Sequence, residues 1–118
     1  MPTVSMIVFK TNLFVAIAFE KEIVLLDISK PQEAEVVKGF GVESLQNITD
    51  IKVSMNEEFL AVAIAPSVET NARIELYTIH FDRKELLPKK TIEGIYSEIE
   101  FMDFSTDDYY LMYKDTIG

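Results

Sequence analysis

The ten residues IKVSMNEEFL at positions 51–60 recur in outline as MDFSTDDYYL at positions 102–111, an offset of 51 residues. Ser54 falls on Ser105, and each is followed by a polar stretch and then by an aromatic residue and a leucine. The apolar runs on either side of this polar stretch predict two β-strands joined by a tight turn. A unit that recurs after about 50 residues indicates a repeat architecture.

Two further matches extend the repeat beyond this hairpin. Ile23-Val24-Leu25 falls on Ile74-Glu75-Leu76 at the same offset of 51, whereas Ala16-Ile17-Ala18 falls on Ala63-Ile64-Ala65 at an offset of 47. The difference predicts four extra residues in the second copy, in the loop at 66–72. Each copy therefore has the same order: a strand and polar turn, a strand of small apolar residues, a loop and an amphipathic strand.

The apolar residues alternate or run continuously, and many of them are Val, Ile, Phe or Tyr, a pattern typical of all-β structure. Pro31, Pro66 and Pro88 are expected to interrupt strands, because proline cannot donate to a sheet ladder. Residues 43–47 are predicted to form a short helical turn. The predicted strands are 5–10, 13–19, 23–28, 35–40, 49–54, 59–65, 73–80, 86–93, 98–105 and 109–113.

Four strands in every 40–50 residues is about the spacing of β-propeller blades. We therefore predict a single all-β segment over residues 1–118, a β-propeller fragment of about two and a half four-stranded antiparallel blades. The blade units are residues 5–40, 48–93 and 97–118, and the last is incomplete. A ring needs at least about four blades, so we expect either a longer parent protein or self-association through the open blade edges.

The most regular part of the chain carries a family resemblance. Its motifs are ITDIKVS (48–54), FLAVA (59–63), IELYTI (74–79) and IEFMDFSTDDYYL (99–111). In this order they resemble WD repeats and, among these, the echinoderm microtubule-associated protein-like family. The resemblance covers residues 48–115 best, with 13–28 as a preceding blade. The chain has no tryptophan, and Leu26-Asp27 and Tyr77-Thr78 stand where the Trp-Asp pair of that family is found.

The resemblance implies a larger protein with tandem propellers that associates with microtubules and organises protein complexes. It implies a cytoplasmic, cytoskeletal location, protein partners that include tubulin or microtubules, no catalytic residue and no cofactor. Two alternatives stay open. One is a phosphoinositide-binding propeller, which would need an adjacent arginine pair that this chain lacks. The other is a WD-repeat subunit of another protein complex.

The formal net charge is −9, from 20 acidic and 11 basic residues. Phosphate backbones and anionic lipids favour Lys and Arg, so neither nucleic-acid nor membrane binding is expected. The chain has no cysteine, a single histidine (His80) and no nucleophile–base pair, so we expect neither an enzyme nor a metal site. The carboxylate pairs Glu57-Glu58 and Asp107-Asp108 are interpreted as solvated residues of equivalent hairpin turns.

Loops held on a rigid scaffold often carry binding function, and one loop of this chain is a candidate for that role. The predicted partner-binding loop consists of Pro66, Ser67, Val68, Glu69, Thr70 and Asn71. A set of aromatic residues near the end of the chain could also form a recognition surface, but their alternation favours packing faces. These residues are Tyr96, Phe101, Phe104, Tyr109, Tyr110 and Tyr113.

Overall fold

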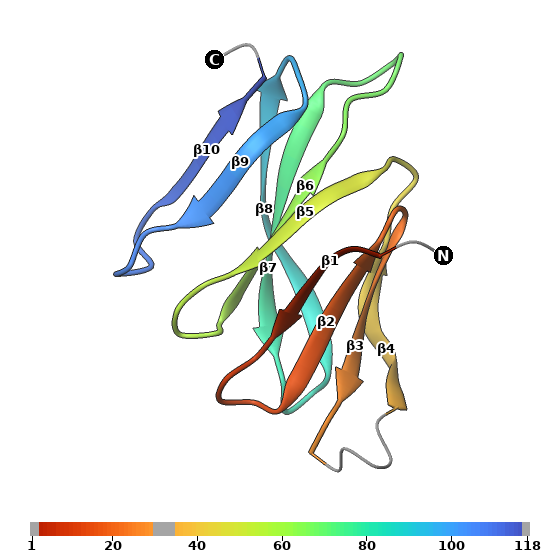
Figure 1. Cartoon of the computed structure of the whole chain (residues 1–118), viewed down its shortest axis with the longest axis vertical. Helices are drawn as coiled ribbons and strands as arrows, with labels where there is room; N and C mark the ends of the chain where they lie inside the picture. Colours follow the sequence, from red (N-terminus) through yellow and green to blue (C-terminus); the bar gives the residue numbers. More distant parts are fainter. Residues whose placement is uncertain (1–2, 30–34, 117–118) are drawn as a thin grey trace.

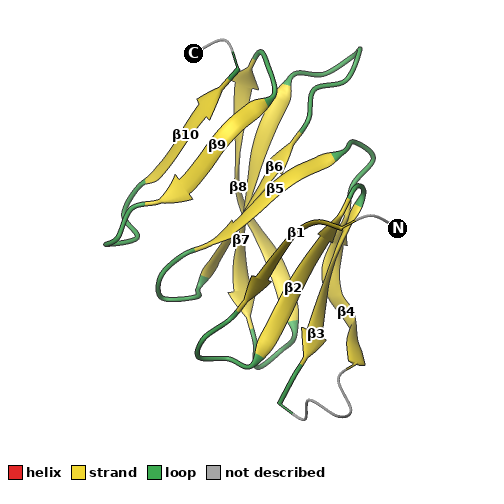
Figure 2. Cartoon of the chain, viewed as in Figure 1, coloured by secondary structure: helices red, strands yellow, loops and turns green. Residues whose placement is uncertain are grey.

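The computed structural model describes residues 3–29 and 35–116, with the backbone alone for residues 35–40. These residues form ten strands and no helix (Figure 2). Accordingly, the described part of the chain contains no helix that is long and apolar enough to cross a membrane. The strands are arranged in three antiparallel sheets of four, four and two strands, so the expected all-β fold is confirmed.

Every sheet is a meander in which each strand pairs with the next one along the chain. The first sheet contains β1 (Thr3–Val8), β2 (Phe14–Phe19), β3 (Glu22–Asp27) and β4 (Glu35–Glu43). The second sheet contains β5 (Ile48–Val53), β6 (Phe59–Ile64), β7 (Ala72–His80) and β8 (Glu85–Ile95). The third sheet contains β9 (Ile99–Phe104) and β10 (Leu111–Asp115).

The second sheet lies between the other two (Figure 1). Its first strand, β5, contacts β1 on one side and β9 on the other, so the first strands of the three sheets lie side by side. The outer strands β4 and β8 are also in contact. The backbone N–H of Ile48 donates to the carbonyl oxygen of Glu20 at 2.6 Å, which ties the start of the second sheet to the first.

Two apolar cores fill the spaces between neighbouring sheets. The first core joins β2 and β3 to β5 and β6, and the second joins β6 and β7 to β9. Burial of these side chains is the main term that stabilises the stack, at roughly 25 cal/mol per Å² of apolar area removed from water. The first core contains Phe9, Phe14, Ala16, Ala18, Ile23, Leu25, Ile48, Ile51, Leu60, Val62, Ile64 and Ile79; the second contains Ala61, Ala63, Ala72, Ile74, Ile95, Ile99 and Met102.

Strand β6 contributes to both cores. Leu60, Val62 and Ile64 belong to the first core, and the alternate residues Ala61 and Ala63 belong to the second. Because both faces of this strand are covered, its sequence has to be continuously apolar rather than alternating. The expectation of a central strand made of small apolar residues therefore has a direct structural reason.

Strand β8 forms an edge of the second sheet, and most of its side chains are exposed. Pro88 lies inside this strand opposite Tyr77, next to a shift of register between Leu76 and Tyr77. The expectation that Pro88 interrupts a strand is therefore wrong, whereas the strand predicted at 86–93, which includes Pro88, is present as part of β8. One side of an edge strand makes no ladder bonds, so a proline there removes no N–H that the sheet needs.

The short helical turn predicted for residues 43–47 is also wrong. Strand β4 extends to Glu43, and the following residues form a bend. Ser44 Oγ donates to the carbonyl oxygen of Gln46 at 2.8 Å and accepts from the N–H of Gln46 at 3.2 Å. A serine side chain that bonds to the backbone in this way competes with helix formation.

The hydrogen bonds of the hairpin turns show that the predicted alignment of the first two copies of the repeat is wrong for β2 and β6. In the first hairpin the N–H of Phe9 donates to the carbonyl of Phe14, and in the second the N–H of Ser54 donates to the carbonyl of Phe59. These equivalent bonds place β2 on β6 at an offset of 45 residues rather than the expected 47. The alternating run AVAIA at 61–65 fits either offset, because a slip of two residues keeps the same side chains on the same face.

The extra length of the second copy changes with this alignment. Ala18 pairs with Ile23, five residues further on, whereas Ala63 pairs with Ile74, eleven residues further on. The connection between β6 and β7 is therefore six residues longer than that between β2 and β3, not four. The longer connection contains the predicted partner-binding loop.

The expectation that the aromatic residues near the end of the chain lie on packing faces is wrong for most of them. Phe104 is partly buried against the second core. The others lie on or beside a third sheet that has only two strands. No described element covers the outer face of this sheet, and Tyr113, which pairs with the buried Met102, lies on the inner face of the edge strand β10. The exposed rings are those of Tyr96, Phe101, Tyr109, Tyr110 and Tyr113.

Candidate functional site: the loop end of the second sheet

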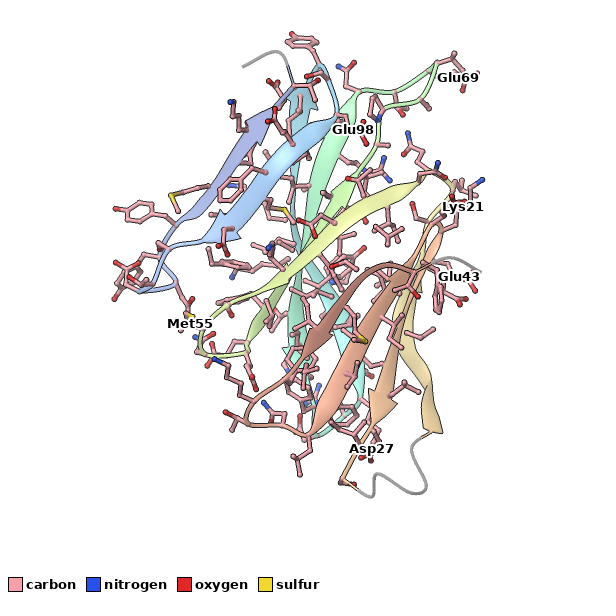
Figure 3. The ribbon with its side chains drawn as sticks, in the orientation of Figure 1. Lys21, Asp27, Glu43, Met55, Glu69 and Glu98 are labelled. Atoms are coloured by element: carbon pink, nitrogen blue, oxygen red, sulfur yellow. The ribbon has the colours of Figure 1, made fainter. Side chains whose placement is uncertain are left out.

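The predicted partner-binding loop, residues 66–71, lies at one end of the second sheet, opposite the turn that carries Met55 (Figure 3). All six of its residues are exposed, and Val68 at the tip has a relative exposure of 105%. The loop is closed on itself, since the N–H of Ser67 donates to the carbonyl of Thr70 at 2.9 Å. Ser67 Oγ also accepts the N–H groups of Glu69 and Thr70, at 3.3 and 3.2 Å.

A neighbouring loop, residues 44–47 between β4 and β5, is bonded to the first one through Gln46. Gln46 Nε2 donates to Thr70 Oγ1 and, at 3.3 Å, to Ser67 Oγ. The amide oxygen of the same side chain accepts a hydrogen bond from the Arg73 guanidinium. We call these two loops together the loop end. Gln46 belongs to one loop and bonds Ser67 and Thr70 of the other, which fixes the relative position of the two loops.

The bonding continues along β7 from Arg73. Its guanidinium forms an ion pair with Glu75, with Nε and Oε2 2.8 Å apart, and the hydroxyl of Tyr77 donates to Glu75 Oε1 at 2.7 Å. These three residues alternate along the strand, so their side chains lie on the same face. Burial first, and then the hydrogen bond to Glu75, raise the pKa of Tyr77 far above its ordinary value, which keeps the phenol protonated as a donor.

An open hollow of about 510 Å³ lies between the two loops. Its lining includes Gln46, Glu69, Arg73 and Glu75. Leu45 on its rim is almost completely exposed, with a relative exposure of 95%. Val68, at the tip of the loop 66–71, is also completely exposed. Exposed apolar side chains beside satisfied polar groups are suited to contacts with another protein rather than to enclosing a small molecule.

Acidic side chains predominate at the loop end. Carboxylates outnumber cations around the hollow, and the Arg73 guanidinium is already paired with Glu75. In the ranges 3–29 and 35–116, no three acidic, histidine or cysteine side chains are close enough together to hold a metal ion. The local charge would favour a partner that presents Lys or Arg.

At the opposite end of the sheets, one residue of each carboxylate pair, Glu58 or Asp107, is an exposed turn residue as the sequence suggested, whereas Glu57 and Asp108 are not solvated residues of this kind. Glu57 is 7% exposed and accepts the N–H groups of Lys10 at 2.6 Å and Thr11 at 3.2 Å, together with Asn12 Nδ2 at 2.9 Å. The carboxylate of the second hairpin turn therefore binds the backbone of the first hairpin turn. We call this contact a turn latch.

The third hairpin turn repeats the turn latch on the second. Asp108 accepts the N–H of Met55 at 2.7 Å and the N–H of Asn56 at 2.8 Å. Glu57 and Asp108 occupy equivalent positions, with φ of 60° and 63°. Sequence reasoning missed this contact, although an acidic residue at the same place in both copies was a usable signal.

The neighbouring acidic residue in the third turn has a different role. Asp107 Oδ1 accepts the Ser105 hydroxyl at 2.6 Å and the N–H of Tyr109 at 3.1 Å. These bonds to the charged form lower the pKa of Asp107 below its ordinary value. Asn56 makes equivalent bonds with Ser54 and Glu58 in the second turn, so this position closes its own turn and does not reach another sheet.

No family model and no curated protein matches the chain. The loop end and the turn latches therefore have to be interpreted from their own geometry.

Proposed function

We propose that the chain is part of a WD-repeat-type β-propeller that acts as a non-catalytic scaffold for protein–protein interaction. The observation that carries this proposal is the loop end. Two loops from different connections are held together by Gln46 and Arg73, and each presents an exposed apolar side chain, Leu45 or Val68. A repeated stack of meander sheets with their first strands side by side supports the propeller part of the proposal.

The proposed partner is a protein, and the microtubule is the partner that we would test first. The resemblance to the microtubule-associated family supports this choice and a cytoplasmic, cytoskeletal location. The net charge of −9 disfavours a contact based on charge attraction, because an acidic surface repels an acidic chain. Binding through Leu45 and Val68 would be apolar and would therefore weaken little as salt rises.

The first experiment is co-pelleting of the folded chain with stabilised microtubules at low and physiological salt. We expect saturable pelleting that survives physiological salt. A folded chain that stays in the supernatant would reject the microtubule as partner.

The loop end is tested by replacing residues 66–71 with a short connection. The first sheet supplies the template, because Glu20 and Lys21 alone join β2 to β3. The shortened chain is expected to keep its free energy of unfolding within about 1 kcal/mol, since exposed loops contribute little to stability, and to lose partner binding by about tenfold or more, the equivalent of about 1.4 kcal/mol. Substitution of the exposed Met55 by Ser, in the turn at the opposite end of the sheet, keeps the backbone N–H and is the matched control. Unchanged binding after shortening would reject the loop end as the binding surface.

A further inference from the structure

The turn latch between the first and second sheets is repeated between the second and third sheets. The third hairpin turn has backbone N–H groups at the positions that donate in the first two turns. Glu57 binds the backbone N–H groups of Lys10 and Thr11, and Asp108 binds those of Met55 and Asn56. The equivalent N–H groups of the third turn belong to Thr106 and Asp107. Within residues 3–29 and 35–116, the N–H of Thr106 has no bonded acceptor, whereas the N–H of Asp107 interacts with the carboxylate of Asp107 itself. The third turn therefore presents one unused latch donor, the N–H of Thr106.

The outer face of the first sheet presents the apolar half of the same contact. In the second sheet, Ile51 and Val53 face the first core, and Ile51 is 1% exposed. Their equivalents at the offset of 45 are Met6 and Val8, and Met6 is 60% exposed. Val15, Ile17 and Phe19 of β2 occupy the positions of Leu60, Val62 and Ile64, all three of which are completely buried. On this face Met6 and Val8 are exposed and the three β2 residues are half-buried, so positions that are completely covered in the second sheet are apolar and only partly covered here.

The outer face of the third sheet presents the complementary surface. Ala61 of β6 belongs to the core that faces the third sheet, so its equivalent at the offset of 51, Met112, lies on the far face of β10. Met112 is exposed, as are Phe101 and Tyr110. Contiguous exposed apolar side chains of this kind mark interaction surfaces rather than ordinary solvent-facing strands.

We propose that these two faces bind each other in a head-to-tail contact between two copies of this chain. In this contact the third sheet of one copy stacks on the first sheet of the next, as the second stacks on the first within one chain. Asn12 stands at the sequence position of Glu57 and Asp108, although the positive φ of the first turn falls on Leu13. Its Nδ2 donates to Glu57 of the same chain, and its Oδ1 would accept the N–H of Thr106 from the next copy. The turns are complementary in charge, because the first carries Lys10 and the third carries Asp107 and Asp108.

This arrangement specifies more than the self-association through open edges that the sequence suggests. It assigns the contact to sheet faces, gives it a direction and names its donor. A head-to-tail contact uses two different surfaces of each copy, so one copy can bind a neighbour on either side. The proposal does not depend on the loop end or on the identity of any other partner.

The latch donor is tested by sedimentation equilibrium of the full chain with Thr106→Pro and Thr106→Ser. Thr106 is the second residue of a turn closed by the bond from the Asp108 N–H to the Ser105 carbonyl, a position at which proline is well tolerated. Thr106→Pro removes an outward N–H and leaves the internal bonds of the turn in place. We expect its dissociation constant to rise about threefold to tenfold, as for the loss of one hydrogen bond, with Thr106→Ser unchanged.

The direction of the contact is tested by mixing two variants. Met6→Lys places a charge on the outer face of the first sheet, and Met112→Lys places one on the outer face of the third. Each variant alone is expected to sediment as a monomer, because one of its two faces is blocked. An equimolar mixture is expected to form a one-to-one dimer and nothing larger, since one intact face remains on each partner. Val68→Lys, at the loop end, is the control and should associate like the unmodified chain.

Three results would overturn the proposal. The first is an unmodified chain that remains monomeric up to the highest soluble concentration. The second is equal association of Thr106→Pro and Thr106→Ser. The third is failure of the two lysine variants to form a dimer when they are mixed, with both shown to be folded by their β-sheet circular dichroism spectra.

Discussion

At the scale of single residues, the turn latch places a carboxylate where the backbone is unfavourable for it. Glu57 and Asp108 both adopt positive φ, a region that glycine and asparagine tolerate better than glutamate. A residue held in such a conformation costs on the order of 1 kcal/mol or more. For Glu57 the cost is offset by two backbone N–H groups and one side-chain amide that its carboxylate accepts.

Substitution of Glu57 by Gln is therefore expected to destabilise the chain. Glutamine keeps one acceptor oxygen and replaces the other with a donor, which faces the N–H groups of Lys10 and Thr11 and cannot bond to them. Loss of a bond to a charged acceptor in a buried place should lower the free energy of unfolding by about 1–3 kcal/mol. Urea denaturation measures this change. The exposed neighbour Glu58→Gln is the matched control, and equal losses for the two variants would contradict the latch.

Tyr77 gives a prediction about alkaline pH. Its pKa is raised in the folded state, chiefly by burial and then by the bond to Glu75, so the folded state favours the protonated phenol. The resulting stabilisation is fully present below the ordinary tyrosine pKa of about 10, and it is lost as pH rises from there through the higher folded pKa. Tyr77→Phe should lower the free energy of unfolding by about 1 kcal/mol at pH 7 and should reduce the loss of stability above about pH 10.

The measurement is urea denaturation of Tyr77→Phe and the unmodified chain across pH 7 to about 11. Tyr96→Phe, which removes an exposed hydroxyl, is the control. If the unmodified chain and Tyr77→Phe lose stability equally above about pH 10, the interpretation of the Tyr77–Glu75 bond is wrong.

At the scale of elements, the hairpin turns act as connectors between sheets as well as between strands. The third sheet has two strands, and part of what holds it to the second is the pair of bonds from Met55 and Asn56 to Asp108. The rest comes from apolar contacts of Ile99 and Met102 in the second core. Loss of a single N–H from the second turn should therefore loosen the third sheet without disturbing the first.

Met55→Pro removes one of these N–H groups. Met55 is the second residue of a turn closed by the bond from the Glu57 N–H to the Ser54 carbonyl, so proline is compatible with the turn itself. We expect amide hydrogen exchange in β9 and β10 to become about threefold to tenfold faster, with exchange in β2 and β3 unchanged. Met55→Ser, which keeps the N–H of residue 55, is the control. Equal exchange in the two variants would show that the Asp108 latch does not stabilise the third sheet.

The sequence predicted the elements well because their causes are local. Alternation and continuous apolar runs placed ten strands, and the run at 61–64 was correctly expected to belong to a strand of small apolar residues. Residues 66–71 were correctly expected to form a loop between strands. The turn latches could not be derived in this way, because Glu57 binds residues 45 to 47 positions away in the chain. The burial of each aromatic ring likewise depends on how the sheets stack, and the alternation of apolar residues in the sequence does not determine it.

At the scale of the whole molecule, the chain is a stack in which each sheet contacts its neighbours and the two cores are separate. Stability in such an arrangement is approximately a sum of units and of the interfaces between neighbouring units. The first core is the larger and joins two four-stranded sheets, whereas the second joins a four-stranded sheet to a two-stranded one. The third sheet should therefore open at a lower free energy than the rest of the stack.

Truncation of one residue in each core separates these two levels of stability. Leu60→Ala and Met102→Ala each remove a completely buried side chain, one from the first core and one from the second. Leu60→Ala should lower the free energy of global unfolding by about 2–5 kcal/mol, with faster amide exchange in all three sheets, because both four-stranded sheets rest on that core. Met102→Ala should instead speed exchange mainly in β9 and β10, because the interface it weakens belongs to the third sheet.

Native-state hydrogen exchange, followed strand by strand, measures the exchange rates of the two variants. Identical exchange patterns in the two variants would mean that the three sheets unfold as one cooperative unit, so that the two cores, although separate in space, are not separate in stability.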